Sequence, residues 1–283
     1  PLLCASTATD PHLSSWHSCA NGKTYYLQTS PEFCMKRLLA AGCGPIYQLG
    51  KAFRHEEHSR QHNPEFTLLE WYRPDWSLTR LMDEVEALVL NAASAFGLTL
   101  EPFPRLTYQQ AFEDTVGLNP HRCSAQDLLQ VANAQISGDF STLDRDGLLD
   151  LVASHLVEPK LPREGVILTE FPASKASLAK TGLSSKGDTV ALRAELYIRG
   201  LEIANAYQEL VDAAEQAQRF QQDLHYRENH QLACVPNPGQ LIAALQNGFP
   251  ECAGVALGLD RLLMVLLGCD NIEEVLSFTT TRA

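Results

Sequence analysis

The stretch from residue 191 to residue 207, ALRAELYIRGLEIANAY, restricts the fold of this chain more than any other. Two β-forming segments are separated there only by the turn Arg199-Gly200. A two-residue turn sets the register of an antiparallel hairpin, so Glu195 is expected to face Ala204. Glu195 and Glu202 are then diagonal neighbours on one sheet face, roughly 7–8 Å apart between backbones. The sequence therefore predicts two carboxylates close together on one face of a sheet.

Two interpretations of this carboxylate pair are open from the spacing alone. Carboxylates on one sheet face can bind Mg²⁺ together with phosphates. They can also be solvent-facing glutamates that pair with Arg193 or Arg199.

Further strand and helix patterns are spread along the whole chain. Strands are indicated at residues 25–29, 46–54, 65–73, 165–172 and from 254, and helices at 32–42, 77–96, 209–228 and up to 268. The segment 100–160 has the pattern of helices and loops, and we interpret it as an insertion or peripheral layer. Because strands occur throughout, with helices between and after them, one α/β sheet domain is favoured over two separate units.

Composition excludes several classes of protein. The chain is 45% hydrophobic and 20% charged, which is typical of a soluble globular protein. It has no run of eighteen apolar residues, so no membrane span is expected. Its eight cysteines form no C-x-x-C pair, a pattern typical of reduced thiols in a cytosolic protein. The net charge of −12 disfavours a nucleic-acid backbone as partner and favours a basic protein or a cationic substrate.

The histidine-rich stretch FRHEEHSRQHNPEFTLLEWY, residues 53–72, first resembles a metal site. For zinc binding, His55 and His58 would have to lie on a helix. A strand ends before them and the turn Asn63-Pro64 follows, so zinc is disfavoured. On the second strand, one face carries an aromatic ring, a carboxylate and a phenol: Phe66, Glu70 and Tyr72. That face is expected to form the wall of a site for a cation.

The segment from Gly254 to Gly268, GVALGLDRLLMVLLG, reads as a strand that continues into a buried helix. Gly254 and Gly258 are small where the backbone must let another group approach closely. Arg261 at the helix start can stack on a base or contact a phosphate.

These segments together resemble class II aminoacyl-tRNA synthetases of the lysyl subgroup. The pattern F-R-x-E followed by H-N-P-E-F-T-x-L-E-x-Y is similar to their second signature, and G-x-A-x-G-x-D-R is similar to their third. ELYIRGLEIANAYQEL resembles the strand pair that binds metal and amino acid. The resemblance covers nearly the whole chain. It implies an α/β (α+β) catalytic domain over residues 1–283, with a mostly antiparallel sheet flanked by helices.

Finer details resemble a free-standing paralogue family that modifies translation elongation factor P. The catalytic signatures begin almost at once, so no anticodon-binding domain is expected. Ala256 replaces a glycine of true lysyl-tRNA synthetases. The resemblance implies a cytoplasmic homodimer that uses ATP and Mg²⁺ to adenylate (R)-β-lysine or lysine. The amino acid is then transferred to a lysine side chain of elongation factor P, and neither tRNA nor a membrane is expected as a partner.

Two alternatives to this function stay open. One is a minimal lysyl-tRNA synthetase that charges tRNA. The other is a non-catalytic paralogue that senses an amino acid.

The resemblance also implies residue roles, with Arg54 and Arg261 as catalytic groups. ATP would contact Arg54, Glu56, His62, Asn63, Phe66, Glu195, Leu196, Gly258 and Arg261, with Phe66 and Arg261 on either side of the adenine, and Mg²⁺ would bind Glu195 and Glu202. The amino acid would contact Ser30, Pro31, Glu32, Glu70, Tyr72, Glu202, Asn205, Glu209 and Ala256. Two positions depart from the family pattern. Asn205 shares a face with Glu202 only if a bulge or strand end lies near Ala204, and Ala206 stands where the family usually has glycine.

Overall fold

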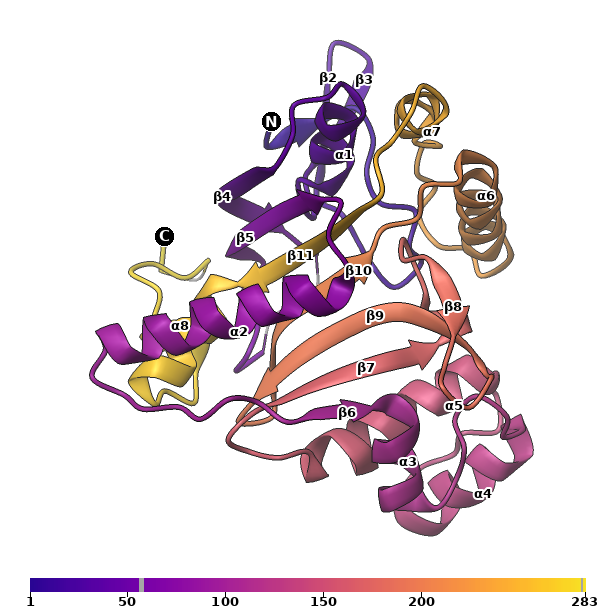
Figure 1. Ribbon diagram of the computed structural model, residues 1–283. Helices are drawn as coiled ribbons and strands as arrows, with labels where there is room; N and C mark the ends of the chain where they lie inside the picture. Colours follow the sequence, from indigo (N-terminus) through magenta and orange to yellow (C-terminus); the bar gives the residue numbers. More distant parts are fainter. Residues whose placement is uncertain (56–58, 281) are drawn as a thin grey trace. The chain divides into compact units, whose positions relative to one another are not determined.

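The computed structural model describes residues 1–55, 59–280 and 282–283, and the chain divides into two compact units. The first unit combines Pro1–Leu81 with Gln208–Ala283, and the second is Met82–Tyr207. Figure 1 labels the elements of both units and colours the chain from its N-terminus to its C-terminus. Each unit is built on mostly antiparallel strands, which agrees with the predicted mostly antiparallel sheet.

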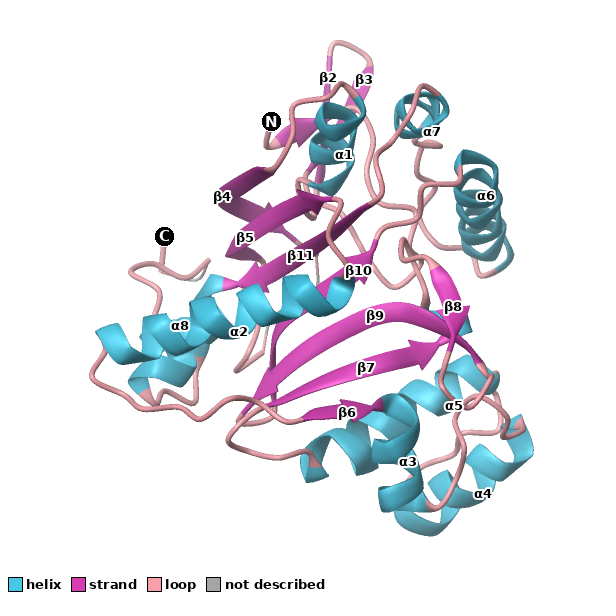
Figure 2. Cartoon of the chain, in the orientation of Figure 1, coloured by secondary structure: helices cyan, strands magenta, loops and turns pink. Residues whose placement is uncertain are grey.

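The first unit contains two small groups of strands (Figure 2). Strands β1 (Leu3–Cys4), β2 (His17–Ala20) and β3 (Lys23–Leu27) form a three-stranded sheet in the order β1-β3-β2. Strands β4 (Ile46–Phe53), β5 (Glu65–Pro74) and β11 (Cys252–Gly258) pair antiparallel in the order β4-β5-β11. The strands predicted at 46–54 and 65–73, on either side of the histidine-rich loop, are therefore confirmed as β4 and β5.

Helices complete the first unit: α1 (Glu32–Ala40), α6 (Ala213–Asn229), α7 (Gly239–Gln246), α8 (Leu259–Leu267) and the 3₁₀ turn η4 (Ile272–Glu274). Helix α1 begins directly after Pro31 and ends before Gly42, whose φ of +82° continues no right-handed helix. Helix α7 packs against α1 and α6, and α8 packs against β5 and β11. No helix of the described residues is long and apolar enough to cross a membrane.

The second unit contains the whole of the 100–160 segment. Helix α2 (Leu78–Ala95) confirms the helix predicted at 77–96 and leads into this unit. It is followed by β6 (Arg105–Thr107), α3 (Tyr108–Val116), α4 (Ala125–Gln135), α5 (Arg145–Val152), η1 (Ala153–Val157) and η2 (Glu158–Lys160). The remaining elements are β7 (Val166–Pro172), η3 (Ala173–Lys175), β8 (Thr181–Leu183), β9 (Thr189–Ile198) and β10 (Leu201–Gln208).

The strands of the second unit pair in the order β10-β9-β7-β6, with β8 on β9. All these pairs are antiparallel except β6 with β7. Helix α3 packs on β6 and β7, and its residues Tyr108 and Phe112 join Leu149, Val152 and Phe171 in one buried core. The helices predicted in this segment therefore include one that packs as a layer on this part of the sheet.

The hairpin of β9 and β10 has the predicted turn and a corrected register. Arg199 and Gly200 have φ values of +54° and +77°, as a two-residue turn with both central residues left-handed requires. The register shifts between Glu202 and Ala204, so Asn205, not Ala204, lies opposite Glu195. The expectation that Glu195 faces Ala204 is wrong because the bulge adds one residue to β10. The bulge that Asn205 required for its role is present.

Candidate active site

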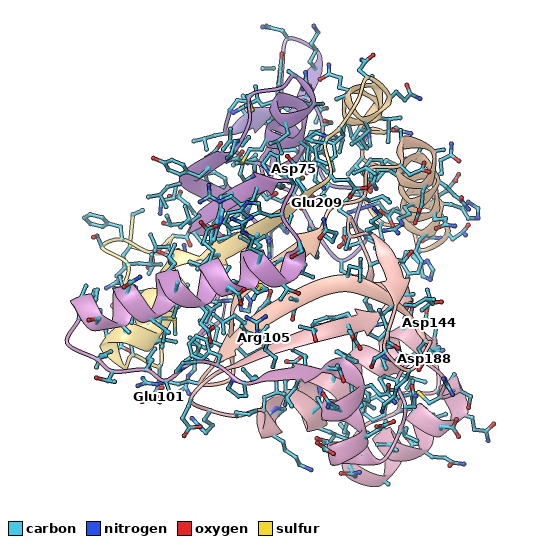
Figure 3. All side chains as sticks on the ribbon, viewed as in Figure 1. Asp75, Glu101, Arg105, Asp144, Asp188 and Glu209 are labelled. Carbon is cyan, nitrogen blue, oxygen red and sulfur yellow. The ribbon has the colours of Figure 1, made fainter. Side chains whose placement is uncertain are left out.

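Four of the residues predicted to bind the amino acid meet in the first unit. Glu32 comes from α1, Glu70 and Tyr72 from β5, and Glu209 follows the end of β10. The backbone N–H of Glu209 donates to the carbonyl of Cys252 on β11, 3.0 Å away, which ties it to the sheet (Figure 3). We call these four residues and Lys36 the carboxylate cluster.

Lys36 is the member of this cluster that the sequence analysis missed. Its side chain is 2% exposed, and its ammonium lies 2.6 Å from Glu32 Oε1 and 2.6 Å from Glu209 Oε2. Both contacts are short ion pairs. Burial opposes the charge of Lys36, but Glu209 and Glu32 outweigh it and raise the pKa of Lys36 above its ordinary value.

The sequence did hold a signal for this lysine. Lys36 follows Glu32 by four residues, which places both side chains on one face of a helix. Its neighbours Met35 and Leu39 are buried, so a lysine on that face must find partners.

Glu70 lies in the same cluster, in surroundings that favour the protonated form of its carboxyl group. It is 2% exposed, and its Oε1 accepts a hydrogen bond of 2.7 Å from the Tyr72 hydroxyl. Its Oε2 is buried without a hydrogen-bond partner among the described residues. Burial, followed by the charge of Glu32, raises the pKa of Glu70 to about 8. Burial likewise raises the pKa of Glu209 to about 7, against the opposing effect of Lys36.

Strand β11 closes one side of the carboxylate cluster. Gly254 pairs with Tyr72 and Ala256 with Glu70 across the β5–β11 ladder. A Cβ atom on Gly254 would lie 2.5 Å from Tyr72 Cδ1 and closer still to Glu209 Oε1. The close approach predicted at Gly254 is therefore that of Tyr72 and Glu209 themselves. The predicted residue Ala256 stands directly beside Glu70 on the next strand.

The remaining predicted amino-acid ligands of the first unit start helix α1. The Ser30 hydroxyl accepts from the backbone N–H of Glu32 at 3.2 Å, and Pro31 occupies the N-cap position. These two residues fix where α1 begins, and thereby where Glu32 and Lys36 lie.

Most residues predicted to bind ATP lie around the loop between β4 and β5. The guanidinium of Arg54 lies over the ring of Phe66, 5.2 Å from its centre. His62 contacts the Arg261 guanidinium through Nε2 and Ser59 through Nδ1, the latter at 2.8 Å. The structure therefore brings Arg261 to His62. Glu56 and His58 lie outside the described residues, and His55 packs edge-on against Trp16, with ring centres 4.5 Å apart.

Asn63 and the start of α8 are anchored by contacts between distant segments. The Asn63 amide donates to the Glu65 carbonyl at 2.6 Å and its oxygen accepts from the Thr280 hydroxyl at 3.1 Å. Gly258 is the N-cap of α8. Asp260, to which no role was given from the sequence, accepts from the backbone N–H of Thr67 at 2.6 Å. Asp260 therefore links the helix that carries Arg261 to the strand that carries Glu70.

The predicted metal ligands lie in the second unit, on one face of the β9–β10 hairpin. Opposed pairs on that face are Glu202 with Tyr197, Asn205 with Glu195, and Tyr207 with Arg193. Glu195 and Glu202 are diagonal neighbours, as predicted. Leu196 is fully buried, and its side chain points to the opposite face because side chains alternate along a strand.

Glu195 is buried and already paired. It is 3% exposed, its Oε1 accepts from the Arg193 guanidinium (Nε at 2.9 Å), and its Oε2 accepts from the Tyr197 hydroxyl at 2.6 Å. The interpretation as a pair with Arg193 holds for Glu195, whereas its solvent-facing position is wrong. Asn205 Oδ1 is buried without a hydrogen-bond partner among the described residues.

The donor set of this face fits a magnesium ion shared with phosphates. A carboxylate has about four lone-pair positions, so Arg193 and Tyr197 leave acceptor capacity on Glu195. Mg²⁺ commonly binds one or two carboxylates and takes its other ligands from phosphates and water. Glu158, missed by the sequence analysis, interacts electrostatically with these groups: burial, then the charges of Glu195 and Glu202, raise the pKa of Glu158 to about 7.

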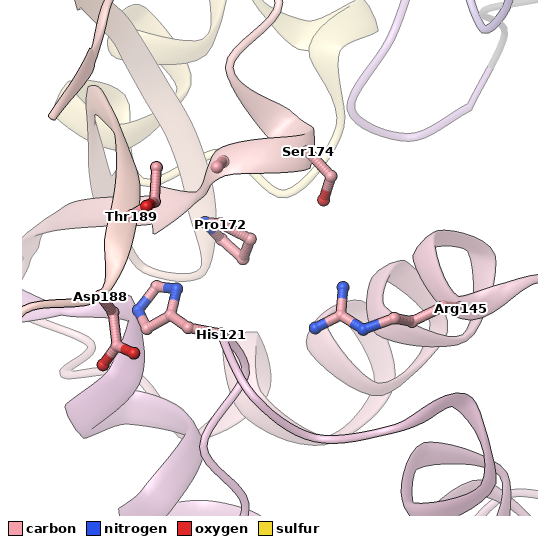
Figure 4. A pocket seen from close by; sticks show the side chains of 7 residues that line it. His121, Arg145, Pro172, Ser174, Asp188 and Thr189 are labelled. Atoms are coloured by element: carbon pink, nitrogen blue, oxygen red, sulfur yellow. The ribbon is translucent and has the colours of Figure 1, made fainter. Parts of the chain in front are cut away.

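A separate cavity of about 320 Å³ lies in the second unit (Figure 4). It is lined by His121, Arg145, Pro172, Ala173, Ser174, Asp188 and Thr189. Arg145 donates to the carbonyls of Cys123 and Pro120, and Asp188 accepts from Arg122 at 2.6 Å. These charged groups therefore anchor their own loops, and none of the predicted site residues lines this cavity.

Comparison with known proteins identifies the family of the chain. Residues 1–282 match the family described as tRNA synthetases class II (D, K and N). A protein of Pseudoalteromonas translucida named elongation factor P--(R)-beta-lysine ligase is 46% identical, over 100% of this chain and 88% of that protein. Proteins of the same name from Salmonella arizonae and Salmonella choleraesuis are each 43% identical over the same shares. The chain belongs to the class II tRNA synthetase family of the D, K and N group.

Proposed function

We propose that this protein is an ATP-dependent ligase that adenylates (R)-β-lysine or lysine and transfers it to a lysine side chain of elongation factor P. The observation that carries the proposal is the carboxylate cluster. Three glutamates, Glu32, Glu70 and Glu209, converge on a buried region in which Lys36 is the one cation paired with them among the described residues. A diamino acid supplies the missing positive charge, and the similar proteins are named for such a substrate.

For the amino acid, we propose contacts with the cluster, with the α1 start at Ser30 and Pro31, and with Ala256. Asn205 and Glu202 are proposed to complete the set. The hydrogen bond from Tyr72 holds Glu70 Oε1, so Oε2 is the oxygen left to accept from an ammonium group.

For ATP, we propose the residues around the β4–β5 loop and the α8 start: Arg54, Glu56, His62, Asn63, Phe66, Gly258 and Arg261, with Glu195 and Leu196 of β9. Arg54 and Arg261 carry positive charge that can compensate the charge developing on the α-phosphate. Glu195 and Glu202 would hold Mg²⁺, which neutralises the phosphates when bound.

The proposed reaction has two steps. The carboxylate of the amino acid attacks the α-phosphorus of ATP, and pyrophosphate leaves. The ε-amino group of the acceptor lysine, after losing its proton, then attacks the carbonyl carbon of the mixed anhydride, and AMP leaves. Orienting the carboxylate against the phosphate is the task of the protein in the first step.

We further propose that both units form one catalytic domain, with the 100–160 segment as a peripheral helical insertion. The family match over residues 1–282 spans both units and supports this. Because the proposed acceptor is a translation factor, a cytoplasmic location follows. A homodimer that does not act on tRNA is part of the same proposal.

The deciding experiment measures ATP–pyrophosphate exchange and then the transfer of labelled amino acid to an acceptor. Exchange is measured with (R)-β-lysine, with lysine and without an amino acid, and label is then followed into elongation factor P or tRNA. We expect amino-acid-dependent exchange and label on the factor. Label on tRNA alone would identify a lysyl-tRNA synthetase, and binding of the amino acid without exchange would identify a sensor.

A further inference from the structure

The carboxylate cluster contains a charge that the sequence-derived list of ligands does not include. Lys36 contacts two of the three glutamates, and it is among the largest fully buried side chains of the described residues. A buried lysine costs free energy unless its partners compensate it. Its position therefore needs a reason beyond packing.

The charges can be counted within the first unit. Glu32, Glu70 and Glu209 supply three negative charges when all are ionised, and Lys36 supplies one positive charge. Two negative charges then remain. An amino acid with two ammonium groups, whose carboxylate is used in the reaction with ATP, matches that number.

Geometry divides the three glutamates into two kinds. Lys36 holds Oε1 of Glu32 and Oε2 of Glu209 at equal distances of 2.6 Å, whereas Tyr72 holds Glu70. Glu32 has a side chain 17% exposed, against 2% for Glu209, so Glu32 is the more accessible end of the Lys36 bridge. Without Lys36, two like charges would face each other in a buried site and would separate or take up a proton.

We infer that Lys36 is a positioning residue for the amino-acid substrate: its ammonium fixes Glu32 and Glu209 and sets the charge of the site to match two substrate ammonium groups. This inference rests on the proposed function and gives a physical reason why the site would prefer a diamino acid. Lys36 itself contacts no reacting atom in this assignment.

The test uses the full chain in amino-acid-dependent ATP–pyrophosphate exchange, with Lys36→Ala as the variant. Charge-assisted contacts of this kind are worth a factor of about ten or more in binding. We expect the KM for (R)-β-lysine to rise at least about tenfold, with the KM for ATP within about twofold of wild type. Arg37→Met is the matched control, because it removes a positive charge from the next, exposed position of α1 and should leave both constants unchanged.

Chemical rescue distinguishes a positioning role of Lys36 from a purely structural role. Propylammonium replaces the atoms lost in Lys36→Ala, and we expect it to lower the KM for (R)-β-lysine, while 1-propanol at the same concentration does not. Equal effects of the two additives, or a wild-type KM in the unrescued variant, would overturn the inference.

The variant Lys36→Arg tests the positioning role of Lys36 if Lys36→Ala does not fold. Arginine keeps a cation between Glu32 and Glu209 but adds a planar fork, so the KM for the amino acid should still rise about tenfold while the protein stays folded. An unchanged KM would refute a positioning role. Absence of exchange by the wild-type protein would instead refute the proposed function, and this inference with it.

Discussion

Replacing Gly254 by alanine tests whether the carboxylate cluster is packed as tightly as its geometry indicates. The added methyl carbon would lie 2.5 Å from Tyr72 Cδ1, about 1 Å short of the 3.4 Å at which ordinary contact begins, and it would also meet Glu209 Oε1. Neither neighbour can move freely. Tyr72 donates a 2.7 Å hydrogen bond to Glu70, and Glu209 lies 2.6 Å from the Lys36 ammonium. One of these contacts must lengthen or break.

The expected cost of this overpacking is about 1–3 kcal/mol of unfolding free energy. For a chain of this size, that corresponds to a fall in melting temperature of roughly 2–4 °C for each kcal/mol. Because the displaced groups are proposed to hold the amino acid, we also expect Gly254→Ala to raise the KM for (R)-β-lysine more than the KM for ATP. Thermal denaturation and pyrophosphate exchange measure the two effects.

Gly239→Ala provides the matched control. Gly239 begins α7, has an ordinary φ and has nothing within 4 Å of an added Cβ. Alanine there should leave the melting temperature and both KM values unchanged or slightly raise stability. If Gly254→Ala behaves like Gly239→Ala, the close approach of Tyr72 and Glu209 to β11 is wrong.

Three further predictions follow from buried charges. A carboxyl group whose pKa is raised in the folded protein contributes stability at low pH and loses that contribution as the pH rises through the folded pKa. The pKa of Glu70 is raised to about 8, so the free energy of unfolding in urea should fall between about pH 5 and pH 8. The variant Glu70→Gln should flatten this slope. Glu195→Gln should cost about 3 kcal/mol in urea denaturation without any ligand, because the buried Glu195 is the charged partner of the partly buried Arg193. Glu202→Gln, at a half-buried position, should cost less than about 1 kcal/mol, and equal costs would contradict the Arg193 pairing. Arg227 donates to the carbonyls of Thr9, Asp10 and Leu13, so Arg227→Leu should expose the N-terminal segment to limited proteolysis; a wild-type cleavage pattern would contradict this.

Much of the fold was predictable because its elements have local signals. The Arg199-Gly200 turn, the Pro31 start of α1 and the apolar spacing of α2 each act within a few residues of sequence. Short or weakly marked elements were missed. Strand β6 has three residues and exists because it pairs with β7, and α7 follows a loop without a side-chain cap.

In the candidate site, too, some features were predictable from the sequence and others were not. The role that the resemblance implies for Asn205 required a bulge or a strand end near Ala204, and a bulge is present there, although the hairpin register expected from the turn had none. The pairing of Glu195 with Arg193 was one of two open alternatives, since spacing cannot decide which neighbour a carboxylate contacts. The part played by Asp260, which joins α8 to β5, follows from a contact across 193 positions of sequence.

The sequence by itself determined which chemical groups are present: the signature arginines, the glutamates of α1, β5 and the β9–β10 hairpin, and the strands and helices that carry them. Only the tertiary structure decided how those charges are shared. Lys36 is bound between Glu32 and Glu209, which lie far apart in sequence, and its burial makes the pairing obligatory. The physical reason is that compensation of a buried charge depends on distance in space and on exclusion of water, and neither is encoded in local sequence pattern.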